Sequence, residues 1–369
     1  MTKLRDGIEA KNRELAIGRG GRFWPHTVPI EPPFALFDPM PGKGRHEPMT
    51  CWPIVDSPRK LKFLRVRPSK EDEYSQVLAE QLLLSLDSSC PVAWEVLGLG
   101  GRIHIQVAAV PQDIAAIASQ VPAHYHNCEA FEAQDLLLEI AAWLECGRAY
   151  RLRRSHLFML KEIQRTEPYA ALAGLLGALK SGQAALFQVL FLPTRYDWRD
   201  STLQVSQDPY NPGKSAFSDM SRLPKLAQAK VSKPLFAVAL RLGASSEELL
   251  DRMEGSFLSQ FQGEENYFVP MAESYPTNAL VSRTTYATGM LLNLGELAAL
   301  IHVPDPGSVP ESLITTQPGP PAPALARQHI LVPLGVNRHR GVEAEVGISG
   351  EQLSRTWPSS EAPATAKPT

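Results

Sequence analysis

The distribution of proline is the feature that most limits what this chain can fold into. The sequence has 32 prolines in 369 residues, and they are concentrated towards its two ends. Proline fixes φ and has no backbone N–H, so it interrupts helices and the interior of sheets. Regular structure is therefore expected mainly within residues 61–303, between a proline-rich segment at 1–60 and another at 304–328.

Between these segments the hydrophobic pattern alternates between the periods of strands and helices. The expected elements are a strand at 61–66, a helix at 71–86, a hairpin at 92–97 and 102–107 around the glycine turn 98–101, a helix at 111–121 and a strand at 127–131. This β-α-β-β-α-β order is that of the ferredoxin-like fold, in which two helices cover one face of an antiparallel sheet.

The same order is expected a second time. Its elements are a strand at 150–160, a helix at 168–179, strands at 184–192 and 235–242, a helix at 245–261 and a strand at 266–270. Serines followed by two glutamates favour a helix start at 245–248, because they satisfy free amides and the helix dipole. The sequence therefore predicts an α+β protein of two tandem ferredoxin-like units with antiparallel sheets.

These patterns divide the chain into segments with different expected roles. The segments are an extended proline-rich arm at 1–60, a first ferredoxin-like unit at 61–135, a second at 136–275 with an insertion at 194–232, a helical segment at 276–303, a linker at 304–328, a short β segment at 329–355, and a disordered tail at 356–369.

Charge and cysteine usage exclude several classes of protein. Lys+Arg number 37 against 39 Asp+Glu, a formal net charge of -2, so no protein-wide basic field attracts nucleic acid. The 4 cysteines form no CxxC pair, which fits neither a disulfide framework nor a zinc ribbon and favours a reducing cytoplasm. No apolar stretch approaches the ~20 residues of a membrane span, and no secretory signal is expected. We expect a cytoplasmic location, including one peripheral to a membrane complex.

Two motifs resemble sites for small ligands. Residues 208–215 end in Gly-Lys-Ser, as a phosphate-binding loop does, but Asp208 and two prolines remove the glycine and amides that a phosphate cradle needs. His124, His126 and Cys128 alternate, so on a strand they would share one face and offer three ligands to zinc. A fourth ligand is missing. We expect no catalytic, cofactor or metal site.

One basic cluster is the candidate for nucleic-acid contact. Its members are Arg148, Arg151, Arg153, Arg154, Lys161 and Arg165. A solvated strand edge, protected from aggregation by its charge, explains the same cluster equally well.

Several short segments, in order along residues 61–350, are similar to the N-terminal region of conjugative coupling-protein type ATPases. These are HerA/FtsK-like DNA-transfer proteins related to type IV secretion. The matching segments are 91–96 with 100–103, 123–125, 187–189, 233–236, 295–304 (GELAALIHVP) and 334–341 (LGVNRHRG). The last two are the most distinctive.

In that family the last segment leads within about twenty residues into a Walker A loop, which opens the motor domain. Here residues 348–355 keep the approach and the sequence then departs, without a Walker A, a Walker B or an arginine finger. The resemblance implies a non-catalytic accessory or assembly protein that acts through contacts with a separate Walker-type ATPase, and touches DNA through that complex.

Three other hypotheses stay open. A solitary nucleic-acid-binding module would use the sheet of a ferredoxin-like unit and the basic cluster. A nucleotide hydrolase would use Lys214 and Ser215. A truncated remnant of a DNA-transfer ATPase would fold without acting.

Overall fold

The structure of the chain is a computed structural model that describes residues 60–70, 73–88, 90–161, 167–194, 198–208, 210–211, 213–215, 218, 220–271, 277–283, 290–313, 324–339 and 342–356. The proline-rich arm, apart from Lys60, and the tail beyond Thr356 lie outside the described residues. The chain divides into two compact units at Thr316 and Gln317. Each unit is an arrangement of helices with antiparallel strands, so the protein is of the α+β class.

The first half of the larger unit contains the elements that the sequence predicts at 61–135. They are β1 (Lys62–Arg67), α2 (Gln76–Leu84), β2 (Val92–Leu99), β3 (Arg102–Ala109), α3 (Pro111–His124) and β4 (Glu129–Ala133). Ser75 caps α2, because its hydroxyl accepts a hydrogen bond from the Leu78 amide. Gly100 and Gly101 connect β2 to β3 with φ values of 51° and 78°, which glycine adopts without the steric cost that a side chain imposes.

The second half repeats this order with additional helices. Its elements are α4 (Leu136–Ile140), η1 (Ala141–Trp143), β5 (Cys146–Leu152), α5 (Ala170–Gly177), β6 (Ala184–Pro193), α6 (Trp198–Ser206), α7 (Leu223–Lys230), β7 (Leu235–Ala244), α8 (Glu247–Phe257), η2 (Leu258–Phe261), β8 (Phe268–Pro270), α9 (Thr277–Val281), β9 (Met290–Asn293) and α10 (Leu294–Leu300). Helices α6 and α7 occupy the predicted insertion. Ser246 caps α8, and Glu247 and Glu248 in its first turn favour the positive end of the helix dipole.

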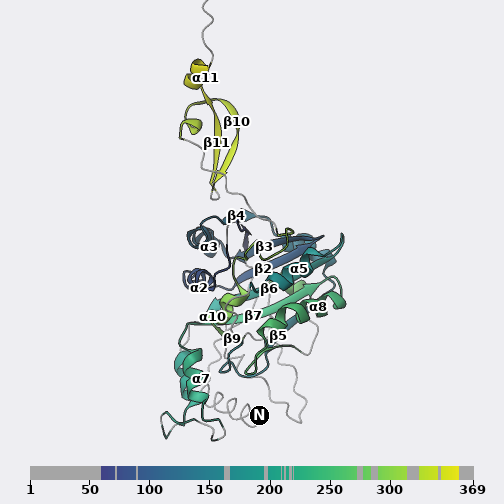
Figure 1. The fold of residues 1–369 in the computed structure, drawn as a ribbon, viewed down its shortest axis with the longest axis vertical. Helices are drawn as coiled ribbons and strands as arrows, with labels where there is room; N and C mark the ends of the chain where they lie inside the picture. Colours follow the sequence, from purple (N-terminus) through teal and green to yellow (C-terminus); the bar gives the residue numbers. More distant parts are fainter. Residues whose placement is uncertain are drawn as a thin grey trace, which may run out of the picture. The chain divides into compact units, whose positions relative to one another are not determined.

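Both halves contribute to one continuous sheet of nine strands (Figure 1). The strand order is β4-β1-β3-β2-β6-β7-β5-β8, and β9 pairs with β7 outside this path. The halves join where β2 pairs antiparallel with β6, from Val92 opposite Phe191 to Leu99 opposite Ala184. The sequence predicts a sheet in each unit but contains no signal for this joint, because a pairing between two units depends on their docking.

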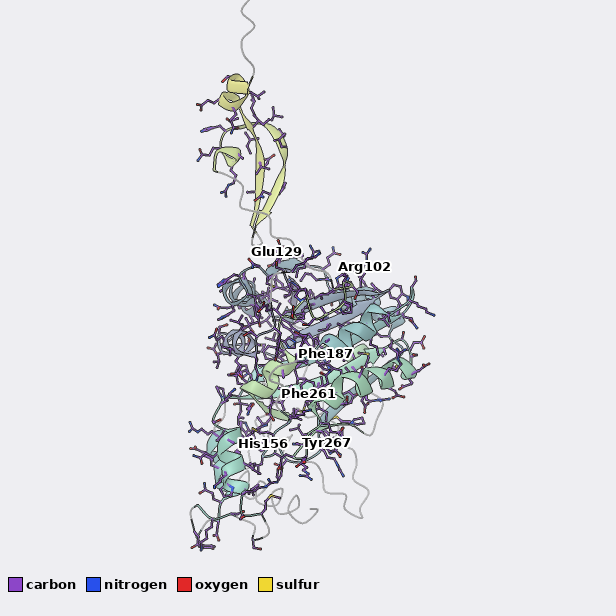
Figure 2. All side chains as sticks on the ribbon, viewed as in Figure 1. Arg102, Glu129, His156, Phe187, Phe261 and Tyr267 are labelled. Carbon is purple, nitrogen blue, oxygen red and sulfur yellow. The ribbon has the colours of Figure 1, made fainter. Side chains whose placement is uncertain are left out.

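Helices α2, α3, α5, α8 and α10 cover one face of the sheet. Alternate residues of each strand enter a common hydrophobic core on this side, as the two-residue period of a strand requires. Phe187 of β6 lies near the centre of this core, where its ring packs against the rings of Tyr169 and Phe257 (Figure 2). The core therefore runs across the β2–β6 joint and unites the two halves.

A row of polar side chains crosses the opposite face of the sheet. Strand register places Arg65, Gln106, Glu95, Gln188 and Arg241 side by side on β1, β3, β2, β6 and β7. We call these five residues the polar row. The amides of Gln106 and Gln188 each donate to one oxygen of Glu95, at 2.9 and 2.6 Å. Glu95 is fully buried, so these bonds replace the water that its carboxylate loses.

Arg283 supplies the charge that the buried Glu95 requires. Its guanidinium donates to both oxygens of Glu95 at 2.9 Å and also to Asp135. Asp135 in turn caps α4 by accepting from the Leu137 amide. Arg283 therefore connects α9 and α4 to the β2–β6 joint through fully desolvated, bidentate hydrogen bonds.

Three segments differ from the sequence-based expectation. The strand predicted at 150–160 ends at Leu152, because residues beyond it turn inward and contribute Leu157 and Phe158 to a separate hydrophobic cluster. The segment expected to be helical at 276–303 also contains strand β9. The predicted linker packs against the larger unit at its start, where Val309 and Leu313 are buried and Leu313 bridges to Ile103.

The smaller unit contains η3 (Ala324–Arg327), β10 (Ile330–His339), β11 (Val342–Ser349) and α11 (Gly350–Thr356). Strands β10 and β11 form an antiparallel hairpin, with irregularities between Ile330 and Val332 and between Pro333 and Gly335. Within the described residues, this pair is the whole of the second sheet.

We predict that Arg283→Met lowers the free energy of unfolding by about 3–5 kcal/mol, because it leaves two buried carboxylates without a cation. Urea unfolding followed by circular dichroism measures this. Arg153→Met is the matched control, because Arg153 is exposed and its loss should change stability by less than about 0.5 kcal/mol. Equal effects of the two substitutions would contradict the role given to Arg283.

Candidate functional site

The six residues of the predicted basic cluster have different surroundings. Arg148 on β5 bonds to three carboxylates of α8, Glu247 at 3.0 Å, Asp251 at 2.8 Å and Glu254 at 2.7 Å. Burial would lower the pKa of Arg148, but the hydrogen bonds to Glu254 and Asp251 outweigh it and raise the pKa. The positive charge of Arg148 is therefore balanced by carboxylates of the same protein.

The other members of the cluster are spread over several places. Arg151 lies half-buried on β5, Arg153 is exposed just beyond that strand, and Arg154 lies 5.6 Å above the ring of Phe158. Lys161 is exposed and lines a pocket that is described below. Arg165 lies outside the described residues. Nucleic-acid contact by this cluster stays a prediction.

The Gly-Lys-Ser segment forms a compact loop whose amides bond within the loop itself. The amide of Gly213 donates to the side chain of Gln207 at 3.4 Å, and the amide of Asp208 donates to the Lys214 carbonyl at 2.9 Å. The Asp208 carboxylate accepts from the Tyr210 amide at 2.8 Å. Because these amides already donate within the loop, they are not available to a bound phosphate.

The three alternating residues that were considered as zinc ligands do not share a strand. His124 ends helix α3, His126 follows in a turn, and β4 begins only after Cys128. Cys128 is buried, whereas His126 is exposed. Within the described ranges, no group of three or more His, Cys, Asp and Glu side chains is arranged to hold a metal ion.

A pocket of about 170 Å³ lies where α2, α7, α10 and the segment after β5 meet. Its lining residues are Gln76, Met159, Leu160, Lys161, Ala229, Ser232, Lys233, Phe261, Asn293, Gly295, Glu296 and Ala299. The pocket thus combines apolar walls with two ammonium groups and two carboxamides. We take it as the candidate site because it brings together segments that are far apart in the sequence.

Glu296 of α10, which lines the pocket, forms a buried ion pair with Lys230 of α7. Both side chains are almost completely buried, at 0% and 5% exposure. Burial lowers the pKa of Lys230, and the neighbouring Glu296 opposes this effect without cancelling it. Glu296 also accepts from the Leu160 amide at 2.8 Å. One carboxylate therefore fixes α7, α10 and the segment after β5 together.

Glu296 also takes part in capping the start of α10. The Asn293 side chain accepts from the Glu296 amide at 3.0 Å, while the Glu296 carboxylate accepts from the Asn293 amide at 2.8 Å. This is a reciprocal capping box, which satisfies two amides that the helix leaves without partners. The bonds that cap the start of α10 therefore also fix Asn293 and Glu296 in the wall of the pocket.

The rim of the pocket carries the accessible charges. Lys233 bonds to Glu80 of α2 at 2.7 Å, and Gln76 donates to the Gly295 carbonyl at 3.4 Å. Lys161 is exposed. Ser232 donates its hydroxyl to the Ala229 carbonyl at 2.7 Å. Lys233, Gln76 and Ser232 therefore already donate to groups of the protein itself.

Behind the pocket, α10 is held at its other end by a buried His302–Glu167 pair. The imidazole Nε2 lies 2.7 Å from the Glu167 carboxylate, and the ring stacks on Tyr169 with centroids 4.0 Å apart. Burial would raise the pKa of Glu167, but His302 and the amides of Asp305 and Tyr169 lower it below its usual value. The segment 295–304 is thus anchored at both ends.

The sequence contained a partial signal for this site. Lys161 belongs to the basic cluster, while Lys233 and Glu296 belong to segments that carry the family resemblance. Their convergence was not predicted, because Lys230, Asn293 and Gln76 follow no motif with a recognisable spacing.

Within the described residues, no helix combines the length and apolar character needed to cross a bilayer.

No protein-family model matches the sequence, and a search of curated proteins also finds no match.

We predict that Lys230→Met lowers the free energy of unfolding by about 3–5 kcal/mol, because it leaves Glu296 buried without its cation. The double substitution Lys230→Met with Glu296→Gln should recover part of this loss, because glutamine removes the unpaired charge and keeps one acceptor oxygen for the capping bond from the Asn293 amide. Lys233→Met removes an exposed pair and should cost less than about 1 kcal/mol. Urea unfolding of the three variants tests this, and an equal loss for Lys230→Met and Lys233→Met would contradict it.

A second prediction concerns pH. Burial, and then the charge of Lys230, lower the pKa of His156 from 6.5 to about 3. The unfolded chain therefore binds a proton that the folded protein excludes, so stability falls as the pH drops below 6.5. His156→Gln should remove about 2 kcal/mol of the decline between about pH 7.5 and about pH 5.

Urea unfolding at several pH values measures this decline. His126→Gln is the control, because His126 is exposed and should leave the decline as in the parent chain. A pH dependence that is the same in both variants would show that His156 does not carry it.

Proposed function

We propose that this chain acts without catalysis, as the counterpart of the accessory N-terminal region of a conjugative coupling-protein type ATPase. In this proposal it binds a separate Walker-type ATPase and contributes to assembly of a DNA-transfer complex. The observation that carries the proposal is the exposure of apolar side chains along β10.

Strand β10 resembles a buried strand in composition but not in surroundings. The exposed fractions of Leu331, Val332, Leu334 and Val336 are 67%, 40%, 68% and 63%. These residues occupy both faces of the strand, and strands with apolar residues on both faces usually lie inside a covered sheet. An isolated two-stranded hairpin is also only marginally stable in water. The hairpin therefore has the properties of an element that completes its packing on a partner.

The two most distinctive segments of the family resemblance have opposite environments. In segment 295–304, Glu296 and His302 are buried and hold the fold together. In segment 334–341, Leu334 and Val336 are exposed. The first segment therefore supports the body of the protein, whereas the second is available to a partner. This division agrees with a role in which the end of the region leads to a motor.

We also infer that the larger unit consists of two tandem ferredoxin-like units, as the proposed relationship requires. The strands of the first half lie in the order β4-β1-β3-β2, and those of the second half in the order β8-β5-β7-β6. Both orders place the first and third strands of a β-α-β-β-α-β unit at the centre. In both halves the helices cover the same face of the sheet.

The proposal predicts that the tagged chain, purified from its own host, carries a protein with a Walker A loop. Complex formation should then be reproduced with the two purified proteins, and light scattering after size exclusion should give a fixed stoichiometry. Leu334→Glu and Val336→Glu should abolish the complex, because they place charge within an apolar interface.

Val77→Glu is the matched control. Val77 lies on α2 and is 63% exposed, so the same substitution is made at an apolar residue outside the hairpin. Loss of the complex in the Val77 variant alone, or the absence of any Walker-type ATPase from the purified material, would refute the proposal.

A further inference from the structure

Arginines gather on the first half of the sheet, on the face opposite the helices. Leu64 and Val66 of β1 enter the core, so Arg65 and Arg67 extend from the other face. On β3, Ile103 and Ile105 enter the core in the same way, which places Arg102 and His104 beside these arginines. Arg102 is the first residue of β3 and is exposed (Figure 2). We call Arg65, Arg67, Arg102 and His104 the arginine face.

These cations are close enough to act on one another. Burial, and then the charges of Arg65, Arg67 and Arg102, lower the pKa of His104 to about 4. His104 is therefore neutral near neutral pH and serves as a hydrogen-bonding group. Burial is also the main cause that lowers the pKa of Arg65, and Arg67 adds to it. The fold thus keeps like charges together at a cost in electrostatic energy.

The arginine face lacks ion pairs with the described carboxylates. Among the residues that the structure describes, Arg65, Arg67 and Arg102 have no carboxylate partner within ion-pair distance. The Nε–H groups of Arg65 and Arg67 are buried and donate no hydrogen bond to any described residue. Of the carboxylates that act on Arg65, Glu95 and Asp135 are held by Arg283, and Glu139 is exposed. This contrasts with Arg148, whose charge three carboxylates balance.

Geometry favours a flat, extended polyanion as the missing partner. Arg65 and Arg67 are two residues apart on one strand, about 7 Å along the sheet, and Arg102 lies on the neighbouring strand. All three cations are arginines, whose planar guanidinium groups bind phosphate by paired hydrogen bonds. The Arg67 guanidinium lies 4.8 Å from the centre of the Phe131 ring, which is a cation–π contact.

We propose that the arginine face binds single-stranded nucleic acid, with Arg67 and Arg102 as phosphate ligands and Arg65 and His104 beside them. Cations beside an aromatic ring on a sheet surface are a general way to hold a single strand, and here Arg102 is exposed and Arg67 is half-buried. The chain as a whole carries a formal net charge of -2. Binding therefore depends on this local cluster. The proposal does not rest on contact with an ATPase.

Fluorescence anisotropy of a labelled oligothymidine, titrated with the purified full-length chain at several salt concentrations, tests the proposal. Two phosphate contacts, from Arg67 and Arg102, give an expected slope of about -1.4 for log affinity against log salt. Arg102→Gln and Arg67→Gln should each weaken binding by roughly tenfold and reduce the slope by about 0.7. Arg102 is exposed, so its substitution keeps the test valid even if Arg67→Gln destabilises the fold.

Arg153→Gln is the matched control, because it removes one exposed arginine of the other basic cluster with the same change in net charge. It should bind as the parent chain does. Three results would overturn the proposal: no binding by the parent chain, equal weakening by Arg153→Gln and Arg102→Gln, or equally effective competition by polyglutamate. The last result would identify an acidic protein segment as the partner.

Discussion

The antiparallel pairing of β2 with β6 is the constraint on which the rest of the structure depends. It turns two sets of four strands into one sheet, and it places Glu95 directly opposite Gln188 at the joint. A buried carboxylate at this position requires a cation and a full set of donors. Arg283 and two glutamine amides supply them, and the guanidinium reaches Asp135 at the same time. The joint thus determines where α4 and α9 pack.

A second buried charge pair, Lys230 with Glu296, joins α7 to α10. Lys230 ends the helix of the insertion, and Glu296 begins α10, so their contact fixes a large insertion to the main body. Such pairs contribute little net stability when both partners are present, but they are costly to break. They therefore select one docking arrangement among many that an apolar contact would allow. The pocket between α2, α7 and α10 is a consequence of this arrangement.

The arginines of the larger unit differ in how their charge is balanced. Arg148 and Arg283 are surrounded by carboxylates, whereas Arg67 and Arg102 have none within ion-pair distance among the described residues. The hairpin makes a similar contrast in apolar surface, because Leu334 is exposed while Leu297 of α10 is fully buried. Unbalanced charge on one surface and uncovered apolar residues on another are consistent with a protein that acts by binding.

The sequence by itself determined the β-α-β-β-α-β order of the main elements in each half, because periods of two and 3.6 residues are local properties of the chain. It also determined the capped start of α8 and the glycine turn between β2 and β3. Only the tertiary structure decided that β2 meets β6, that Lys230 meets Glu296, and which arginines keep an unbalanced charge. Lys230 and Glu296 are 66 positions apart, and burial and pairing depend on packing that no local pattern records.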